Sequence, residues 1–255
     1  MRRRLDQAMV QRGLAASRTE AARLVDAGVV TVSGAPALKS SRLVADDEAI
    51  VVREVRRWVG RGAEKMLGAL EAFEIDVVGR SVIDAGASTG GFTECLLDAG
   101  SLRVLAIDVG RNQLHERLLQ DERVVSRERC DIRSVTRDSL PFAASLAVAD
   151  LSFISLTSVV GHLAALLDPE EGHGTCEMIL LVKPQFEVGR AEASKGRGVI
   201  TDPALHDEAL GKVTKALENA GCVVRQVRES PVLGGEGNKE FLVHAVVTQR
   251  DAPCP

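Results

Sequence analysis

The sequence predicts an α/β fold with a mainly parallel β-sheet and one antiparallel strand, preceded by a small α+β domain. Three observations support this prediction. From residue 63 onward, short apolar strands alternate with helical patterns, as in a parallel sheet covered on both faces. The last two strands, 222–228 and 240–248, have no helix between them, so one of them should run antiparallel. Residues 1–58 hold 11 basic and 7 acidic side chains, whereas the remainder holds 21 and 29, which indicates two different modules.

The amino-terminal module, residues 1–54, is expected to contain two helices and two strands. Ser17 and Glu20 have the spacing of a capping box, in which two side chains satisfy free backbone amides at the start of a helix. Glycines end both helices, at Gly13 and Gly28. The expected helices lie within residues 5–28, and the expected strands are 29–32 and 49–52.

Arginines away from the apolar helix faces are the candidate RNA-binding residues of this module. A basic module ahead of a larger acidic one suggests a polyanion-binding arm on a catalytic body. A solvated surface would explain the same charge equally well, so charge alone leaves both interpretations open. The candidates are Arg3, Arg4, Arg12, Arg18 and Arg23.

Residues 55–62 are the predicted linker, because basic residues and two glycines surround the single tryptophan, Trp58. Trp58 can pack the two domains together or stack on a nucleotide, and packing is the simpler interpretation because it requires no ligand. The second domain is expected over residues 63–248, followed by a tail at 249–255.

The second domain is expected to alternate helices and strands, with a flexible loop at 234–237. The expected helices are 64–73, 91–99, 112–119, 155–167 and 202–221, and the expected strands are 81–84, 103–107, 123–126, 146–149, 178–182, 222–228 and 240–248.

The composition argues against several classes of protein. No apolar run approaches the roughly 18 residues of a membrane-spanning helix. The basic amino terminus has no apolar segment behind it, as a secretory signal would require. The five cysteines and five histidines are dispersed, without the spacing of metal ligands or of a disulfide framework. We therefore expect a cytoplasmic monomer with no metal and no membrane partner.

A glycine-rich turn joins the first strand of the second domain to the following helix. Glycines at such a turn let the backbone approach a ligand at the carboxyl edge of the sheet. The turn lacks the Gly-Lys-Ser/Thr of a phosphate loop and departs from the dinucleotide-binding pattern. Asp84, two residues before Gly86, would repel a pyrophosphate but suits the amino group and sulfonium of S-adenosylmethionine.

Acidic residues follow three successive strands behind this turn. Asp108 can accept hydrogen bonds from both hydroxyls of a ribose, and Asp131 is placed to meet an adenine amino group. One such residue is more often a turn former or a helix cap, but three together indicate a methyltransferase. The candidate cofactor-binding residues are Asp84, Gly86, Ser88, Thr89, Gly90, Gly91, Phe92, Asp108, Asp131 and Asp150.

Two lysines and two carboxylates are expected at the same edge of the sheet. Asp150 and Lys183 end the fourth and fifth strands, Glu240 begins the last strand, and Lys65 lies on the helix before the first. A single lysine at a strand end is more often a snorkelling surface cation. In a cluster, however, carboxylates hold the cations, and burial beside a second cation lowers the pKa of a lysine so that it can accept a proton.

Residues 3–53 resemble the S4-type RNA-binding domain. The resemblance implies that the basic helical face contacts RNA phosphates, in agreement with the charge distribution. It is carried by Leu5-Asp6, Arg12-Gly13-Leu14, Ser17-Arg18-Thr19-Glu20-Ala21 and Ala27–Gly34.

Residues 63–247 resemble the FtsJ-type 2′-O-ribose methyltransferases, which have a Rossmann-like class I methyltransferase fold. The resemblance implies a catalytic tetrad at Lys65, Asp150, Lys183 and Glu240, with Lys183 as general base and Asp150 orienting it. Glu64 departs from the pattern, because a histidine is expected there. The matching segments are Asp84–Thr93, Ala149–Ser155, Val182–Gly189 and Gly237–Phe241.

Nearly the whole chain resembles the TlyA family, whose members methylate cytidine ribose in ribosomal RNA and are sometimes labelled hemolysins. The resemblance implies S-adenosylmethionine as cofactor and ribosomal RNA or ribosomal subunits as partners. Two alternatives come from other classes of protein. A membrane-active hemolysin would require an apolar or strongly amphipathic segment that the sequence lacks. An inactive RNA-binding assembly factor is disfavoured by the intact tetrad.

Overall fold

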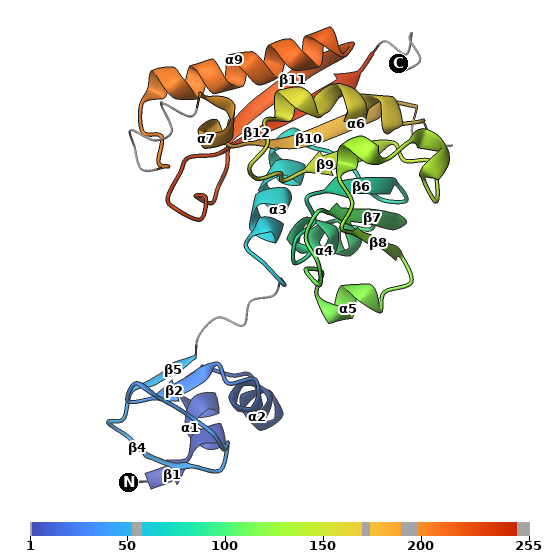
Figure 1. Cartoon of the computed structure of the whole chain (residues 1–255). Coiled ribbons are helices and arrows are strands. Elements are labelled where there is room, and N and C mark those ends of the chain that lie inside the picture. Colours follow the sequence, from blue (N-terminus) through green and yellow to red (C-terminus); the bar gives the residue numbers. More distant parts are fainter. Residues whose placement is uncertain (1, 53–57, 170–173, 190–197, 249–255) are drawn as a thin grey trace. The chain divides into compact units, whose positions relative to one another are not determined.

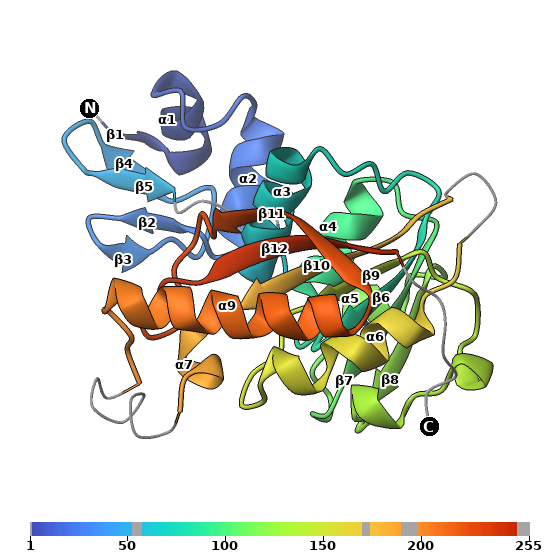
Figure 2. The same ribbon diagram turned by 90° about the horizontal axis from the view of Figure 1, so that it is seen from above.

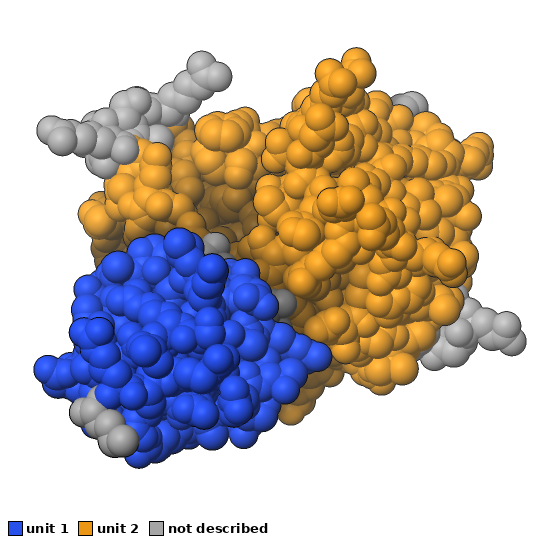
Figure 3. Space-filling view, turned by 90° about the horizontal axis from the view of Figure 1, so that it is seen from below, with its two compact units in different colours: residues 1–57 blue, residues 58–255 orange. Residues whose placement is uncertain are grey.

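The computed structural model describes residues 2–52, 58–169, 174–189 and 198–248 (Figure 1). The chain folds into two compact units, residues 1–57 and 58–255, which are shown in different colours in Figure 3. Each unit has its own hydrophobic core, so each is described by itself.

Unit 1 packs two helices, α1 (Leu5–Gln11) and α2 (Arg18–Asp26), against short strands (Figure 1). The Ser17 half of the predicted capping box is confirmed, since the Ser17 side chain accepts a hydrogen bond from the Glu20 amide at 3.1 Å. The Glu20 carboxylate instead accepts from the Ala16 amide at 2.5 Å. Two small sheets have the orders β3-β2-β5 and β1-β4, and the core holds Leu5 and Met9. The strands are β1 (Arg2–Arg4), β2 (Val30–Val32), β3 (Ala35–Pro36), β4 (Leu43–Ala45) and β5 (Ile50–Val52).

The sequence patterns did not predict β1, β3 or β4. These strands have two or three residues each, and β1 consists of three arginines, so apolar alternation gives no signal there.

Unit 2 is built on a seven-stranded sheet with the strand order β11-β12-β10-β9-β6-β7-β8. The strand β12 pairs antiparallel with both of its neighbours, and the remaining pairs are parallel, which confirms the predicted sheet. The strands are β6 (Ser81–Ala85), β7 (Arg103–Asp108), β8 (Val124–Glu128), β9 (Leu146–Ala149), β10 (Cys176–Val182), β11 (Cys222–Glu229) and β12 (Phe241–Val247).

Helices cover both faces of this sheet, as Figure 1 and Figure 2 show. One core cluster packs α6 and α9 against one face, and the other packs α3 and α4 against the opposite face. The apolar strands are therefore buried on both sides, as expected for a parallel sheet. The helices are α3 (Gly62–Phe73), α4 (Gly91–Asp98), α5 (Glu116–Leu119), α6 (Val160–Leu166), α7 (Pro184–Glu187) and α9 (Pro203–Asn219).

Two predicted helices are shorter than the sequence suggested. The helix expected at 112–119 begins only at Glu116, because the Glu128 carboxylate accepts hydrogen bonds from the amides of residues 112–114 and holds them in a turn. The helix expected at 155–167 is divided into a 3₁₀ turn at Leu156–Ser158 and α6.

Part of the predicted linker lies outside the described residues, and the rest belongs to unit 2. Residues 55–57 lie outside the described residues. Trp58 and Val59 pack against the core cluster of α3 and α4, and Gly62 is the first residue of α3. These residues therefore belong to unit 2, because apolar burial fixes them there.

A polar cluster lies at the amino ends of β6, β9 and β10 in unit 2 and includes a residue from the middle of β12. Arg80, just before β6, donates to the Ser145 hydroxyl and carbonyl oxygens at 3.0 and 2.8 Å and to Glu177 Oε2 at 2.5 Å. His244 Nε2 of β12 lies 2.9 Å from Glu177 Oε1. The hydrogen bond with His244, together with the hydrogen bond and positive charge of Arg80, lowers the pKa of Glu177 to about 2. This cluster links the strands β6, β9, β10 and β12.

Candidate functional site

The carboxyl edge of the sheet carries the glycine-rich turn between β6 and α4. Gly86 has a φ of 82°, and a Cβ atom there would lie 2.6 Å from the Asp150 carbonyl oxygen. At Gly91, a Cβ atom would lie 3.0 Å from the Ala63 amide nitrogen. Only glycine lets these backbones approach one another, and the approach leaves the turn open toward solvent.

Asp108 ties this turn to the end of β7. One carboxylate oxygen accepts from the Ser88 amide at 2.8 Å, and the other accepts from the Gly110 amide at 2.6 Å. Ser88 has a φ of 48°, a left-handed conformation that these hydrogen bonds help to hold. Asp108 therefore shapes the turn, and its predicted contact with a ribose remains a prediction.

A pocket of about 110 Å³ opens at the glycine-rich turn. It brings together six of the ten predicted cofactor-binding residues, together with residues at the start of α3. Gly90 lies instead against leucines of the α5 region, where a Cβ atom would collide with Leu118. The lining residues are Gly60, Arg61, Gly62, Gly86, Ala87, Ser88, Thr89, Gly91, Phe92 and Asp150.

Asp84 lies behind this pocket and is completely buried. Its Oδ2 accepts a hydrogen bond from the Thr93 hydroxyl at 2.6 Å, whereas its Oδ1 has no hydrogen-bond partner among the residues that the structure describes. Burial disfavours the charged form and raises the pKa of Asp84 to about 7, with the negative charge of Asp150 acting in the same direction. Asp84 is therefore a buried carboxyl group beneath the turn, and a positive charge close to it would favour its ionised form.

Asp131 follows β8 as predicted, but its carboxylate is engaged locally. Arg133 donates to both oxygens at 3.0 and 2.6 Å, and these hydrogen bonds lower the pKa of Asp131 to about 2. The contact of Asp131 with adenine stays a prediction.

The four predicted catalytic residues form two ion pairs at the same edge. Lys183 Nζ lies 2.7 Å from Asp150 Oδ1, and Lys65 Nζ donates to Glu240 Oε2 at 2.5 Å. Lys65, Lys183 and Glu240 are each at most 8% exposed. Charges this deeply buried require partners, and the pairs supply them.

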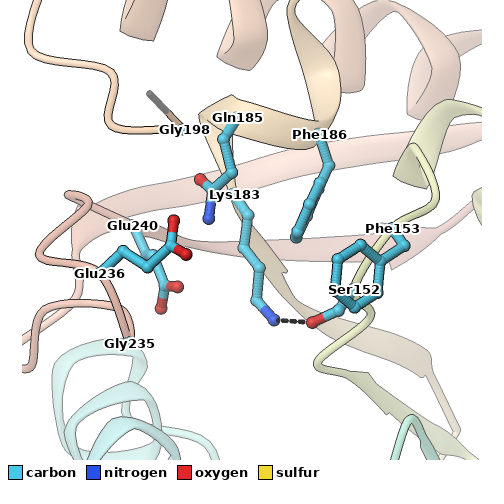
Figure 4. Close-up of a pocket in the computed structure, with 9 residues that line it drawn as sticks. All are labelled: Ser152, Phe153, Lys183, Gln185, Phe186, Gly198, Gly235, Glu236 and Glu240. Atoms are coloured by element: carbon cyan, nitrogen blue, oxygen red, sulfur yellow. Dashed lines mark hydrogen bonds between the residues drawn. The ribbon is translucent and has the colours of Figure 1, made fainter. Parts of the chain in front are cut away.

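A larger pocket, of about 380 Å³, lies beside these ion pairs (Figure 4). Lys183 projects into it and donates a hydrogen bond to Ser152 Oγ at 2.8 Å. Aromatic rings line part of the wall, with the Phe153 and Phe186 centroids 5.3 Å apart. The full lining is Ser152, Phe153, Lys183, Gln185, Phe186, Gly198, Gly235, Glu236 and Glu240.

Seven lining residues were absent from the sequence-based candidates, namely Ser152, Phe153, Gln185, Phe186, Gly198, Gly235 and Glu236. Four of them lie within three residues of Asp150 or Lys183, so proximity to those side chains was an available signal. Glu236 gave none. The segment 234–237 was expected to be a flexible loop; it is a loop without helix or strand, and its residues Gly235 and Glu236 line the pocket.

The predicted RNA-binding arginines lie on the surface of unit 1, but most also hold its fold together. Arg4 and Arg18 both donate to the buried Asp6 at 3.0 Å. Arg12 donates to backbone carbonyls of the segment 45–48. Arg3 pairs with Asp46 at 2.9 Å, and Arg23 is exposed on α2.

The described part of the chain contains neither a cluster of metal ligands nor a membrane-spanning helix. No group of three or more potential ligands is arranged to hold a metal ion. None of the described helices is both long and apolar enough to span a membrane.

Comparisons with known proteins agree with this geometry. Residues 58–246 match the FtsJ-like methyltransferases, and residues 3–50 match the S4 domain. The chain belongs to the FtsJ-like methyltransferase family, with an S4 domain at its amino terminus.

Individual relatives extend over both domains. The 16S/23S rRNA (cytidine-2′-O)-methyltransferase TlyA of Mycobacterium tuberculosis is 44% identical, over 95% of this chain and 89% of that protein. A solved structure from Streptococcus thermophilus, described as a hemolysin, is 36% identical with a TM-score of 0.72, covering 99% of this chain and 90% of that one. The magnesium protoporphyrin IX methyltransferase of Synechocystis, solved with bound S-adenosylhomocysteine, shares the fold at 17% identity, a TM-score of 0.52 and coverage of 78% and 89%.

Proposed function

We propose that this protein transfers a methyl group from S-adenosylmethionine to the ribose 2′-hydroxyl of cytidine in ribosomal RNA. One observation carries the proposal. Asp150 lines the smaller pocket at the glycine-rich turn and pairs with Lys183, which lines the larger pocket. A donor in one pocket and an acceptor in the other would therefore meet at this ion pair.

The residues of the smaller pocket fit S-adenosylmethionine. The glycines leave room for a ligand against the backbone, and the buried Asp84 beneath it would be favoured in its ionised form by the positive charge of the ligand. When bound, S-adenosylmethionine supplies an electrophilic methyl group on a positively charged sulfur. Asp108 would accept from its ribose through lone pairs not used by Ser88 and Gly110.

In this proposal Lys183, as the neutral amine, accepts the proton of the 2′-hydroxyl. Asp150 and Ser152 hold its Nζ from two directions, at 2.7 and 2.8 Å, which fixes where an incoming hydroxyl can bind. Glu240 lines the same pocket, and its pairing with Lys65 compensates its charge. Most of the acceleration should come from holding donor and acceptor in line, with a smaller part from proton removal.

The remaining parts of the proposal concern RNA binding by unit 1, the class of substrate, the oligomeric state and the cellular compartment. Unit 1 would bind structured RNA through phosphates, because it resembles an S4 domain and is rich in arginine. The relative from M. tuberculosis acts on ribosomal RNA, so we propose the same class of substrate for this chain. A monomer working in the cytoplasm is the corresponding expectation.

The direct test is mass-spectrometric mapping of ribose methylation in ribosomal RNA from cells with and without the chain. The proposal expects at least one 2′-O-methylcytidine that depends on the protein. A map with no dependent ribose methylation would overturn it.

Lys183→Arg tests the proton-accepting role. Arginine keeps the positive charge but cannot release its proton at working pH, so methyl transfer should fall about a hundredfold or more. Binding of S-adenosylmethionine should persist, because Lys183 does not line the smaller pocket. Lys215→Arg, on the exposed surface of α9, is the matched control. A single-turnover rate for Lys183→Arg within about threefold of the parent would leave positioning as the whole mechanism.

A further inference from the structure

The larger pocket has two chemically different sides (Figure 4). Phe153 and Phe186 lie on one side, and Gln185, Glu236 and Glu240 lie on the other, with Lys183 between them. Its volume of about 380 Å³ lies in the range of small-molecule sites, and one nucleoside fits such a space. Aromatic faces stack on bases regardless of their identity, so the aromatic side cannot choose among bases. Any selectivity must come from the polar side.

The three polar side chains are not equally available to a ligand. Glu240 is engaged by Lys65. Gln185 Oε1 is buried and has no hydrogen-bond partner within the described part of the chain. The Glu236 carboxylate lines the pocket, is exposed, and has no ion pair or hydrogen bond among the described residues. Gln185 and Glu236 therefore keep unused hydrogen-bonding capacity.

The backbone around Glu236 is held in place by hydrogen bonds. The Gly234 amide donates to the Asn238 carbonyl at 2.9 Å, and the Gly237 amide donates to the Gly234 carbonyl at 3.0 Å. Asn238 is 1% exposed, and its side chain bonds the Ile200 amide and the Gly198 carbonyl, each at 2.8 Å. A carboxylate that a rigid loop holds in one position can discriminate between ligands more strongly than a carboxylate on a mobile loop.

We propose that Glu236 selects cytosine over uracil at this site by accepting a hydrogen bond from the 4-amino group of the base. This inference rests on the proposed function and adds the residue that would determine its specificity. An ionised carboxylate only accepts hydrogen bonds. Cytosine presents a donor at N4, whereas uracil presents an acceptor oxygen at the same position, so Glu236 attracts the first and repels the second.

Gln185 has a different part in this scheme. An amide can rotate to present either its oxygen or its nitrogen, so Gln185 can bond cytosine and uracil alike. Gln185 supports the base in the pocket, and the fixed polarity of Glu236 makes the choice. The two residues therefore predict different outcomes when each is replaced.

The test compares two RNAs that differ at one position. The substrate is a ribosomal RNA transcript carrying the cytidine mapped as the target, and its partner has uridine there. Selectivity is the ratio of kcat/KM for the two, measured by transfer of radiolabelled methyl. The parent should prefer cytidine by roughly tenfold to a hundredfold, the range of one good base contact.

Glu236→Gln should reduce this preference to within about threefold, largely by raising the rate with uridine, while S-adenosylmethionine binding is unchanged. Gln185→Leu should lower kcat/KM for both RNAs and keep the ratio. Glu218→Gln, exposed on α9, is the matched control. An unchanged ratio in Glu236→Gln, or equal loss on both RNAs, would overturn the inference. A parent that methylates neither RNA would contradict the proposed function instead, so the two failures are distinguishable.

Discussion

Asp84→Asn removes a carboxyl group that the fold buries completely. Burial raises the pKa of Asp84 to about 7 from an ordinary 3.8. The unfolded chain therefore releases this proton near pH ~4, whereas the folded protein keeps it until about pH 7. Between these values the folded state binds more protons than the unfolded state, so the free energy of unfolding of the parent falls as the pH rises.

The size of the effect follows from the two pKa values. A tenfold difference in proton affinity corresponds to about 1.4 kcal/mol, so burying the ionised carboxylate costs the folded state up to about 4 kcal/mol. Asparagine has no such ionisation. The free energy of unfolding of Asp84→Asn, relative to the parent, should therefore increase by roughly 2–4 kcal/mol between about pH 4.5 and pH 8.

Urea unfolding followed by circular dichroism at a series of pH values measures this difference. A change in packing caused by the substitution shifts all values equally, so only the slope with pH tests the reasoning. Asp207→Asn, on the exposed side of α9, is the control and should show no slope. A difference between Asp84→Asn and the parent that is constant with pH would refute the assignment of a raised pKa.

The same group gives a signature of cofactor binding. If the positive charge of S-adenosylmethionine lies above Asp84, binding should favour the ionised carboxylate. Affinity of the parent, measured by calorimetry, should then increase as the pH rises through about 7, and Asp84→Asn should lose this dependence. An identical pH profile for both proteins would place the positive charge elsewhere.

Three further perturbations probe other parts of the chain. Asp6→Asn should destabilise the S4 unit by about 1–2 kcal/mol at neutral pH, because Arg4 and Arg18 hold the pKa of Asp6 at about 2. The difference in free energy of unfolding between variant and parent, measured in urea, should vanish as the pH falls toward 2. Phe153→Gly should stabilise the protein by about 1 kcal/mol in thermal unfolding, since Phe153 has a φ of 66° and is 91% exposed, while methyl transfer falls through loss of the pocket wall. RNA affinity measured by filter binding should fall with salt with a log–log slope of several, and a flat dependence would contradict phosphate contacts by the S4 unit.

Local signals predicted the sheet and the positions of its reactive side chains. The apolar runs of β6, β9 and β10 are buried on both faces, so Asp84, Asp150 and Lys183 at their ends could be placed at one edge from the sequence alone. The absence of a connecting helix predicted that one of the last two strands is antiparallel; the structure shows that it is β12, with Glu240 just before it.

Contacts between loops distant in sequence could not be predicted in the same way. Glu128 shortens the helix before β8 by binding amides more than ten residues earlier. Glu236 enters the pocket because the buried Asn238 fixes its loop to residues 198–200. Arg12 was predicted only as a candidate for contacting RNA, yet it also closes a turn in its own domain. In each case the partner has no periodic relation to the residue, so sequence spacing carries no information about it.

The cluster of Arg80, Ser145, Glu177 and His244 has a consequence for protein engineering, because it lies at one end of the sheet and the pockets lie at the other. It joins β6, β9, β10 and β12 at the end of the sheet opposite the pockets, and Asp150, Lys183 and Glu240 adjoin three of those strands. A slip of one strand by a single residue would displace a reactive group by about 3.3 Å and would separate buried charges at the other end. Loops at the carboxyl edge can therefore be exchanged to accept new substrates, provided that the cluster at the opposite end is retained as the reference point for strand alignment.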